Sequence, residues 1–295
     1  MGEREDGLMG TLNEKAVKML GWLNVISYED GSIPLLNDSA NGIAPTTKQL
    51  NDYADRLHIT HPPIYPSTHL LKESGYRKIV KSNYECIIDI GNIGPDYIPG
   101  HAHADTFNFE LRIDGKPFIV DTGLSTYETN ARRMTERGTA AHNTVEVSAT
   151  DSSEVWGGFR VAERAYVTKA EESSERIVAS HNGYRKKFGI THTRAWHFAE
   201  DKIIIKDALE PKGDGIARLH FHPDITEAMI REHITIHKSQ ITMQSRRNED
   251  NHESLITNYE LPITNYNYAP EFNKTQKALV MEIPFENQLN VEIKI

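Results

Sequence analysis

The sequence predicts a mainly β fold: a large antiparallel β-sandwich of two or more stacked sheets, preceded by a short helical segment. From Gly75 onward, β-branched and aromatic residues alternate with polar ones in short runs at roughly ten-residue spacing, which is typical of strands. Before this point, apolar residues recur at spacings of three and four, the helical period. Asp114-Gly115 favours a tight hairpin between antiparallel strands. We therefore expect a helical segment at 1–66 and a β-domain at 67–295.

Two helices are expected in the first segment. Thr11 and Glu14 have the spacing of a capping box, and so do Thr46 and Gln49, so each pair predicts a helix start. The proline-rich stretch 61–66 ends the second helix, because proline cannot continue a helix. Two helices alone cannot bury their apolar faces, so they must pack on the rest of this chain or on helices elsewhere.

The β-domain is expected to contain many short strands and no internal repeat. A polar stretch at 246–253 predicts a loop, and Asp201-Lys202 predicts a second hairpin turn. The strands are expected near 76–90, 105–113, 116–121, 143–149, 159–171, 174–181, 188–198, 201–208, 216–222, 232–245, 253–258, 277–282 and 289–295.

Composition excludes several classes of protein. The chain has 295 residues with a net charge of −9, so binding to nucleic acid through phosphate neutralisation is not expected. No apolar run approaches the ~20 residues of a membrane helix. Cys86 is the single cysteine, which rules out a disulfide within the chain and a cysteine-rich zinc module; we expect a buried strand thiol. The N-terminus lacks a signal-peptide pattern, so an export signal would have to lie on a longer parent protein.

The most informative region begins at residue 99. If this segment is extended, His101, His103 and Asp105 project from one face, because strand side chains alternate. Such a polar face needs a ligand, a metal or water to satisfy it. Further along, Asp121 ends an apolar strand and His142 begins another. Imidazoles with a carboxylate are a usual ligand set for Zn²⁺. Separate hydrogen-bonded histidines are the alternative, but the joint pattern favours a metal site.

Other polar residues are candidates for substrate binding. Arg132, Arg133 and Arg137 form a basic cluster of the kind that a carboxylate or sulfate needs beside a histidine-lined cleft. Tyr127 lies between Asp121 and this cluster; a sugar-stacking or acid/base role and a half-buried loop position are equally compatible with it. A second pair, His220 and His222, is interpreted as a polar strand face.

Several motifs, in order and spacing, resemble the heparinase II/III-like polysaccharide lyases. The motif at residues 100–111 resembles the Gly-His-x-His-x-Asp-x-x-x-Phe-x-Leu signature of that family. The resemblance extends over most of the chain. The matching segments are Trp22-Leu23, 30–38, Ser74-Gly75-Tyr76, 100–111, Val120-Asp121-Thr122-Gly123 with Tyr127, 137–145 and Trp156-Gly157-Gly158-Phe159-Arg160.

The resemblance implies a fold, a site and a reaction. It implies a C-terminal β-sandwich preceded by the last helices of an α/α toroid, and an acidic polysaccharide bound in the cleft between them. It implies that His103, Asp121 and His142 bind a mainly structural zinc ion and that His101 faces the substrate as a catalytic residue, with Tyr127 and Arg137 as candidate substrate contacts. The implied reaction is β-elimination at a uronic acid. The parent protein would be periplasmic or extracellular, of bacterial type.

The sequence departs from the family because nearly all of the toroid is missing. In the family, the toroid supplies an asparagine or histidine that neutralises the carboxylate and a tyrosine that acts as base or acid. The chain is therefore expected to hold half of an active site, as the C-terminal domain of a lyase. The alternatives are a non-catalytic carbohydrate-binding or structural β-domain, and a cupin-like metalloenzyme with a smaller barrel and redox-active iron.

Overall fold

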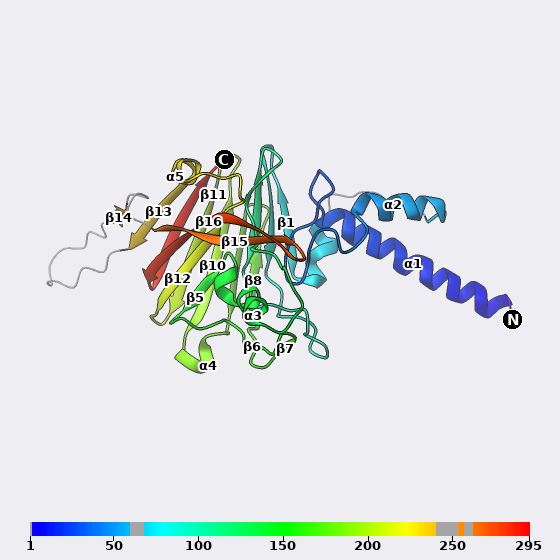
Figure 1. The fold of residues 1–295 in the computed structure, drawn as a ribbon, viewed down its shortest axis with the longest axis horizontal. Helices are drawn as coiled ribbons and strands as arrows, with labels where there is room; N and C mark the ends of the chain where they lie inside the picture. Colours follow the sequence, from blue (N-terminus) through cyan, green and yellow to red (C-terminus); the bar gives the residue numbers. More distant parts are fainter. Residues whose placement is uncertain (1, 60–67, 240–252, 257–261) are drawn as a thin grey trace.

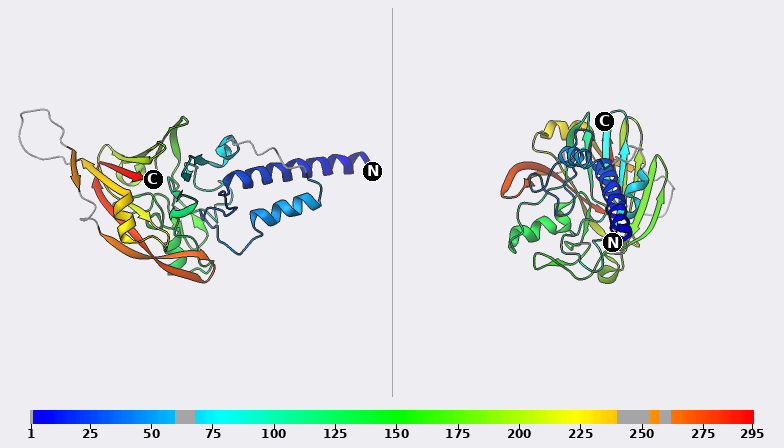
Figure 2. Two further views of the ribbon diagram at one scale, coloured as in Figure 1. Left: turned by 90° about the horizontal axis from the view of Figure 1, so that it is seen from above. Right: turned by 90° about the vertical axis from the view of Figure 1, so that its right-hand side faces the viewer.

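The computed structural model describes residues 2–59, 68–239, 253–256 and 262–295, and it is mainly β (Figure 1). Antiparallel sheets form one body, and helices α1 (Gly2–Ile26) and α2 (Thr47–Arg56) extend from one side of it (Figure 2). This confirms the predicted fold class. The predicted domain boundary at 66/67 and the proline-rich stretch 61–66 lie outside the described residues. No helix in the described ranges is long and apolar enough to cross a bilayer.

The predicted start is confirmed for α2 and wrong for α1. Thr46 caps α2 with the complete capping box, because its side chain accepts from the Gln49 amide while the Gln49 side chain accepts from the Thr46 amide. The box predicted at Thr11 is wrong, since α1 already begins at Gly2 and the Thr11 hydroxyl donates to the Gly7 carbonyl inside the helix.

The C-terminal end of α1 anchors the helical segment on the β-domain. Ile26, Leu36, Leu71 and Ile87 are buried together there, and Trp22 packs against them. Leu71 belongs to the 3₁₀ helix η1 (Thr68–Ser74), which leads into the first strand. Apolar contacts at this junction fix where the segment between α1 and α2 lies.

The first sheet has four strands in chain order: β1 (Tyr76–Val80), β2 (Tyr84–Asp89), β3 (Phe109–Ile113) and β4 (Lys116–Ile119). The single strand predicted over 76–90 is therefore two antiparallel strands. The hairpin between β3 and β4 turns at the predicted Asp114-Gly115, where both residues have positive φ (49° and 72°). Cys86 is buried in β2, as predicted.

The other strands form a seven-stranded sheet, a four-stranded sheet and a two-stranded hairpin. The seven-stranded sheet has the order β14-β13-β17-β11-β10-β9-β8, the second four-stranded sheet β15-β16-β12-β5, and the hairpin β6-β7. Their bounds are β5 (Val145–Val147), β6 (Val155–Trp156), β7 (Arg160–Val161), β8 (Val167–Glu172), β9 (Arg176–His181), β10 (Thr191–Phe198), β11 (Lys202–Glu210), β12 (Asp214–His220), β13 (Ile234–Ser239), β14 (Glu253–Ile256), β15 (Ile263–Glu271), β16 (Lys274–Glu286) and β17 (Gln288–Lys294).

One apolar core joins the sheets. It includes Phe109 from the first sheet, Trp196 and Ile205 from the seven-stranded sheet, and Met281 from the second four-stranded sheet. Short helices lie in the connections: α3 (Ala131–Arg137), η2 (Thr139–Ala141), α4 (Arg185–Phe188) and α5 (Glu227–His233). The core is that of a sandwich of open sheets, and it does not match the single barrel of the cupin-like alternative.

Several strand predictions need correction. The predicted strand 159–171 is interrupted between β7 and β8, β15 was not predicted, and residues 105–108 lie in an irregular segment before β3. Most of the predicted loop 246–253, and the ends of the strands predicted at 232–245 and 253–258, lie outside the described residues. The predicted turn at Asp201 does join β10 and β11.

Candidate functional site

The site residues lie on four segments that connect or precede the strands. They are the chain after α1, the loop between β2 and β3, the turn after β4, and the segment that includes α3 and η2. The loop between β2 and β3 is not extended at its histidines, so His101, His103 and Asp105 do not share a strand face. Instead the His101 side chain is 68% exposed and that of His103 is fully buried.

Asp38 joins the site residues together. Its Oδ2 lies 2.8 Å from His101 Nδ1, and its Oδ1 lies 2.7 Å from His103 Nε2. The buried guanidinium of Arg133 donates to both oxygens, with 2.8 Å between Nη2 and Oδ2. Burial raises the pKa of Asp38, but the hydrogen bonds from His103 and Arg133 outweigh it and hold this pKa well below its usual range. Sequence reasoning did not select Asp38, although it lies in the segment 30–38 that carries the family resemblance.

His101 combines a fixed ring with an open surface. Its Nδ1 is bound to Asp38, and the ring centroid lies 5.9 Å from that of Tyr127 and 6.2 Å from that of Phe159. When Nδ1 carries the hydrogen donated to Asp38, Nε2 is free to accept a proton. The arrangement therefore presents an oriented imidazole at the surface.

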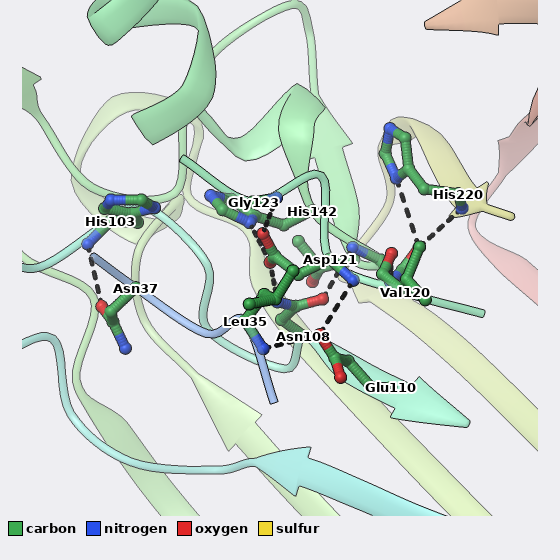
Figure 3. Close-up of polar contacts among 12 residues, drawn as sticks. Leu35, Asn37, His103, Asn108, Glu110, Val120, Asp121, Gly123, His142 and His220 are labelled. Atoms are coloured by element: carbon green, nitrogen blue, oxygen red, sulfur yellow. Dashed lines mark hydrogen bonds and ion pairs between the residues drawn. The ribbon is translucent and has the colours of Figure 1, made fainter. Parts of the chain in front are cut away.

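His103, Asp121 and His142 meet in the interior, as Figure 3 shows, and all three are fully buried. His142 Nδ1 lies 2.7 Å from Asp121 Oδ2, and the rings of His103 and His142 are 5.3 Å apart between centroids. Burial lowers the pKa of His103 to about 4. Burial raises the pKa of Asp121, but the neighbouring His142 outweighs this and the pKa is lowered. The structure thus brings together the three predicted metal ligands.

Two nitrogens of this cluster are available to a metal ion. His103 Nδ1 and His142 Nε2 are buried without a hydrogen-bond partner, although buried nitrogens are normally bonded. The other nitrogen of His103 is held by a carboxylate, as in most metal-binding histidines. Within the described ranges, no three His, Cys, Asp or Glu side chains are already arranged as a metal cluster. The residues fit a zinc ion by their chemistry, and the zinc site stays a prediction.

Asp121 is fixed by its own turn. Its Oδ1 accepts from the Gly123 amide at 2.8 Å, and its Oδ2 accepts from the Asn108 side chain (Figure 3). Gly123 has a φ of 74° at a point where a Cβ would lie 2.1 Å from the Ala269 carbonyl oxygen. Only glycine fits this close approach, which explains the Asp-x-Gly sequence after β4.

Asn143 and Glu110 connect the segments of the site. The Asn143 side chain donates to the carbonyls of Phe109 and Val120, both at 2.9 Å, and its Oδ1 accepts from the His220 amide at 2.7 Å. Glu110 accepts from the amides of Leu35 and Asp121 (Figure 3) and from the Tyr28 hydroxyl. These bonds fix the backbone around Asp121 and His142.

The other candidates lie at different depths. Arg137 is fully buried and donates to the Ala102 carbonyl from Nε (3.2 Å) and Nη2 (2.8 Å), so it supports the backbone beside His101. Its substrate-binding role stays a prediction, as does that of Tyr127, which is 37% exposed beside His101. Arg132 pairs with Glu136 at 3.1 Å. The polar face predicted for His220 is wrong, because His220 is buried and its ring packs against Tyr266.

A cavity of about 720 Å³ adjoins His101. Asn37, Tyr76, Asn92 and Asp105 line it with His101. Burial raises the pKa of Asp105 to about 7, and its Oδ2 is buried without a hydrogen-bond partner. The cavity therefore offers polar groups beside the oriented imidazole.

Solved structures share this fold at low sequence identity. The heparan sulfate lyase HepC from Pedobacter heparinus superposes with a TM-score of 0.59 at 16% identity, over 92% of this chain and 45% of that one. A heparinase III superposes with a TM-score of 0.54 at 15% identity, over 96% of this chain and 48% of that one. The chain thus spans about half the length of these structures. No curated protein is similar enough to match it.

The fold is a β-domain of antiparallel sheets with His103, Asp121 and His142 buried together at its loops. The family model described as heparinase II/III-like, C-terminal, matches residues 65–295. The chain belongs to the heparinase II/III-like family, and the match covers its C-terminal domain.

Proposed function

We propose that this chain is the C-terminal domain of a lyase that cleaves uronic-acid-containing polysaccharide by β-elimination and that it holds one half of the active site. The observation that supports this most directly is His101, whose Nδ1 is bound to the buried Asp38 carboxylate while its ring faces the surface. An imidazole held in this way is oriented to exchange a proton with a bound substrate.

The proposed reaction needs two proton transfers. The C5 proton of the uronic acid is removed, its electron pair forms the C4–C5 double bond, the C4–O bond breaks, and the departing glycosidic oxygen gains a proton. His101 Nε2 takes part in one of these transfers. A zinc ion held by His103, Asp121 and His142 would fix the segments that present His101.

The other half of the site would come from a helical unit that packs on the helical segment. In α1, Leu8, Met9, Leu12 and Met19 are between 54% and 71% exposed, and clusters of such residues mark interaction surfaces. The solved structures are about twice the length of this chain, which is consistent with such a unit. It would neutralise the substrate carboxylate and supply the second proton-transfer group.

The test is cleavage of acidic polysaccharides by this chain together with the helical unit of a full-length homologue, followed by the ultraviolet absorbance of the 4,5-unsaturated product. We expect His101→Ala to abolish product formation, and His197→Ala, at a half-buried strand histidine, to leave it unchanged. Full activity of the His101→Ala variant would refute the role of His101. Binding of polysaccharide without product in every combination would favour the non-catalytic carbohydrate-binding alternative.

A further inference from the structure

The β6–β7 hairpin places aromatic side chains at the surface next to His101. Trp156 is 46% exposed and Phe159 is 38% exposed, although most aromatic side chains are largely buried. The Phe159 ring lies 6.2 Å from the His101 ring and 5.6 Å from the Tyr127 ring, between centroids. The hairpin therefore continues the surface that begins at His101.

The hairpin is attached to the same buried group that orients His101. Arg133 Nε donates to the Gly158 carbonyl at 2.9 Å, while the rest of its guanidinium binds Asp38. The Arg133 guanidinium carbon also lies 5.0 Å from the centroid of the Phe159 ring. Since Arg133 and Asp38 are buried, the exposed rings rest on a rigid base and are pre-organised for binding.

Arg160 adds an available positive charge. It is paired with Trp156 across the hairpin, and its guanidinium carbon lies 4.8 Å from the centroid of the indole ring. Arg160 is exposed, and among the described residues it contacts the Trp156 ring and forms no ion pair with a carboxylate. A guanidinium that stacks on an aromatic ring keeps its N–H donors free at the edge, where they match the oxygens of a carboxylate or sulfate.

We propose that the β6–β7 hairpin is a binding subsite for an anionic sugar unit adjoining the unit that reacts at His101. Trp156 and Phe159 contact the apolar face of the sugar ring, and Arg160 binds its carboxylate or sulfate group. This inference rests on the proposed function, because it takes the ligand of the His101 site to be an acidic polysaccharide. The unpaired Arg160 favours an anionic glycan over an apolar protein segment as the occupant.

The experiment is a binding titration with the full chain. The probes are a heparan sulfate octasaccharide and an alginate octasaccharide, with neutral maltooctaose as the control sugar. The chain has three tryptophans, of which Trp196 is fully buried and Trp22 packs at the base of α1, so the Trp156 signal is taken as the fluorescence change that the wild type shows and Trp156→Ala lacks. We expect Arg160→Gln to weaken acidic-sugar binding roughly tenfold and to reduce its salt dependence, since one charge-assisted contact is lost. Trp156→Ala should weaken binding similarly and abolish the fluorescence change.

Matched variants elsewhere test the specificity of these effects. Arg185→Gln and Phe188→Ala change an exposed arginine and a partly exposed aromatic residue on α4, and they should bind like the wild type. The subsite is refuted if Arg160→Gln and Trp156→Ala bind like the wild type, if maltooctaose binds as tightly as the acidic sugars, or if the wild type binds no acidic sugar. The subsite and the proposed function can fail separately. If acidic-sugar binding depends on Arg160 and Trp156, but this chain together with the helical unit of a homologue forms no lyase product, the subsite is supported and the proposed function is contradicted.

Discussion

Asp38 accepts hydrogen bonds from His101, His103 and Arg133 on its two carboxylate oxygens, and each of these partners has a different task. His101 faces the surface, His103 faces the interior, and Arg133 supports the β6–β7 hairpin. Because the Arg133 side chain is fully buried, its charge depends on this one carboxylate. At the scale of single residues, Asp38 therefore controls the geometry of the site.

Asp38→Asn is expected to lower the free energy of unfolding by about 3–5 kcal/mol, because it leaves the buried Arg133 charge without its partner. Asp52→Asn is the matched control. Asp52 pairs with Lys48 at 2.7 Å, and both side chains are exposed (47% and 82%), so the loss of this pair should lower stability by less than about 1 kcal/mol. Urea unfolding measures both values, and equal losses in the two variants would contradict the role assigned to Asp38.

A second buried network of hydrogen bonds joins β9, β10 and β11 of the seven-stranded sheet. The Gly183 amide donates to His181 Nδ1, so His181 Nε2 carries the hydrogen and donates to His192 Nδ1 at 3.0 Å. His192 Nε2 then donates to Asp207 at 2.7 Å. This order of donors requires both rings to be neutral. Burial, together with the positive charge of Arg194, lowers the pKa of His181 well below its usual value.

This lowered pKa predicts acid sensitivity. Above about pH 6.5, His181 is neutral in both the folded and the unfolded protein. Below this pH, the unfolded protein binds a proton at His181 and the folded protein does not. The free energy of unfolding therefore falls as the pH decreases. Replacing the ring in His181→Gln should reduce the slope between pH 6 and 5, by at most about 1.4 kcal/mol per pH unit, the value for one proton. Urea unfolding at pH 7, 6 and 5 measures the slope.

The comparison between wild type and variant isolates the histidine. Asp105 and Glu110 have pKa values raised to about 7 by burial, and they act in the opposite direction because they favour folding at low pH. Their contributions cancel when the two slopes are subtracted. His58→Gln, at an exposed position, should leave the slope unchanged. An unchanged slope in His181→Gln would show that His181 is not the group that resists protonation.

At the scale of elements, β3 holds the N-terminal segment through one carboxylate. Glu110 accepts from the Tyr28 hydroxyl at 2.8 Å and from the Leu35 amide at 2.9 Å. The segment between these two residues leads directly to Asn37 and Asp38. The two hydrogen bonds from the N-terminal segment to Glu110 of β3 therefore help to position Asp38 in the site.

Tyr28→Phe is expected to lower stability by about 1 kcal/mol, because the buried Glu110 oxygen loses one donor. Hydrogen exchange at the Leu35 amide should accelerate, since the segment opens more readily. Tyr53→Phe, at a 52% exposed tyrosine on α2, is the control and should change neither quantity. Unchanged exchange at Leu35 in Tyr28→Phe would indicate that other contacts hold the segment.

The sequence predicts regular elements better than it predicts the site. Hairpin turns and the Thr46 capping box follow from local chemistry, and the structure confirms them. The loop that carries His101 and His103 follows no local rule, because distant groups shape it: the Asn37 side-chain oxygen accepts from the His103 amide at 3.1 Å, and the Arg137 carbonyl accepts from the Ala104 amide at 2.9 Å. Period-2 patterning could not reveal that one histidine is exposed and the other buried.

At the scale of the whole molecule, the interior site depends on segments far apart in the chain. His103, Asp121 and His142 come from three loops, and Asp38, from the helical segment, binds one of them, His103. Sequence motifs predicted these three residues as ligands through the family resemblance, and the assignment stays a prediction. They did not identify Asp38, since a single carboxylate in a polar loop has no spacing that marks it. His103 Nδ1 and His142 Nε2 are buried without a hydrogen-bond partner. A metal ion bound to them would join the loops that carry these residues, and its effect would therefore extend to the stability of the whole molecule.

The last prediction is that purified protein contains one zinc ion and that a chelator lowers its melting temperature, because metal binding by separate loops stabilises the folded state. His103→Ala should abolish stoichiometric zinc, as measured by elemental analysis, and should make the melting temperature insensitive to chelator. His101→Ala is the matched control, since its exposed ring lies outside the ligand set, and it should retain zinc. If the wild type carries no stoichiometric metal and chelator leaves its melting curve unmoved, the zinc site is refuted, and the three buried side chains form a hydrogen-bonded cluster with two unsatisfied nitrogens instead.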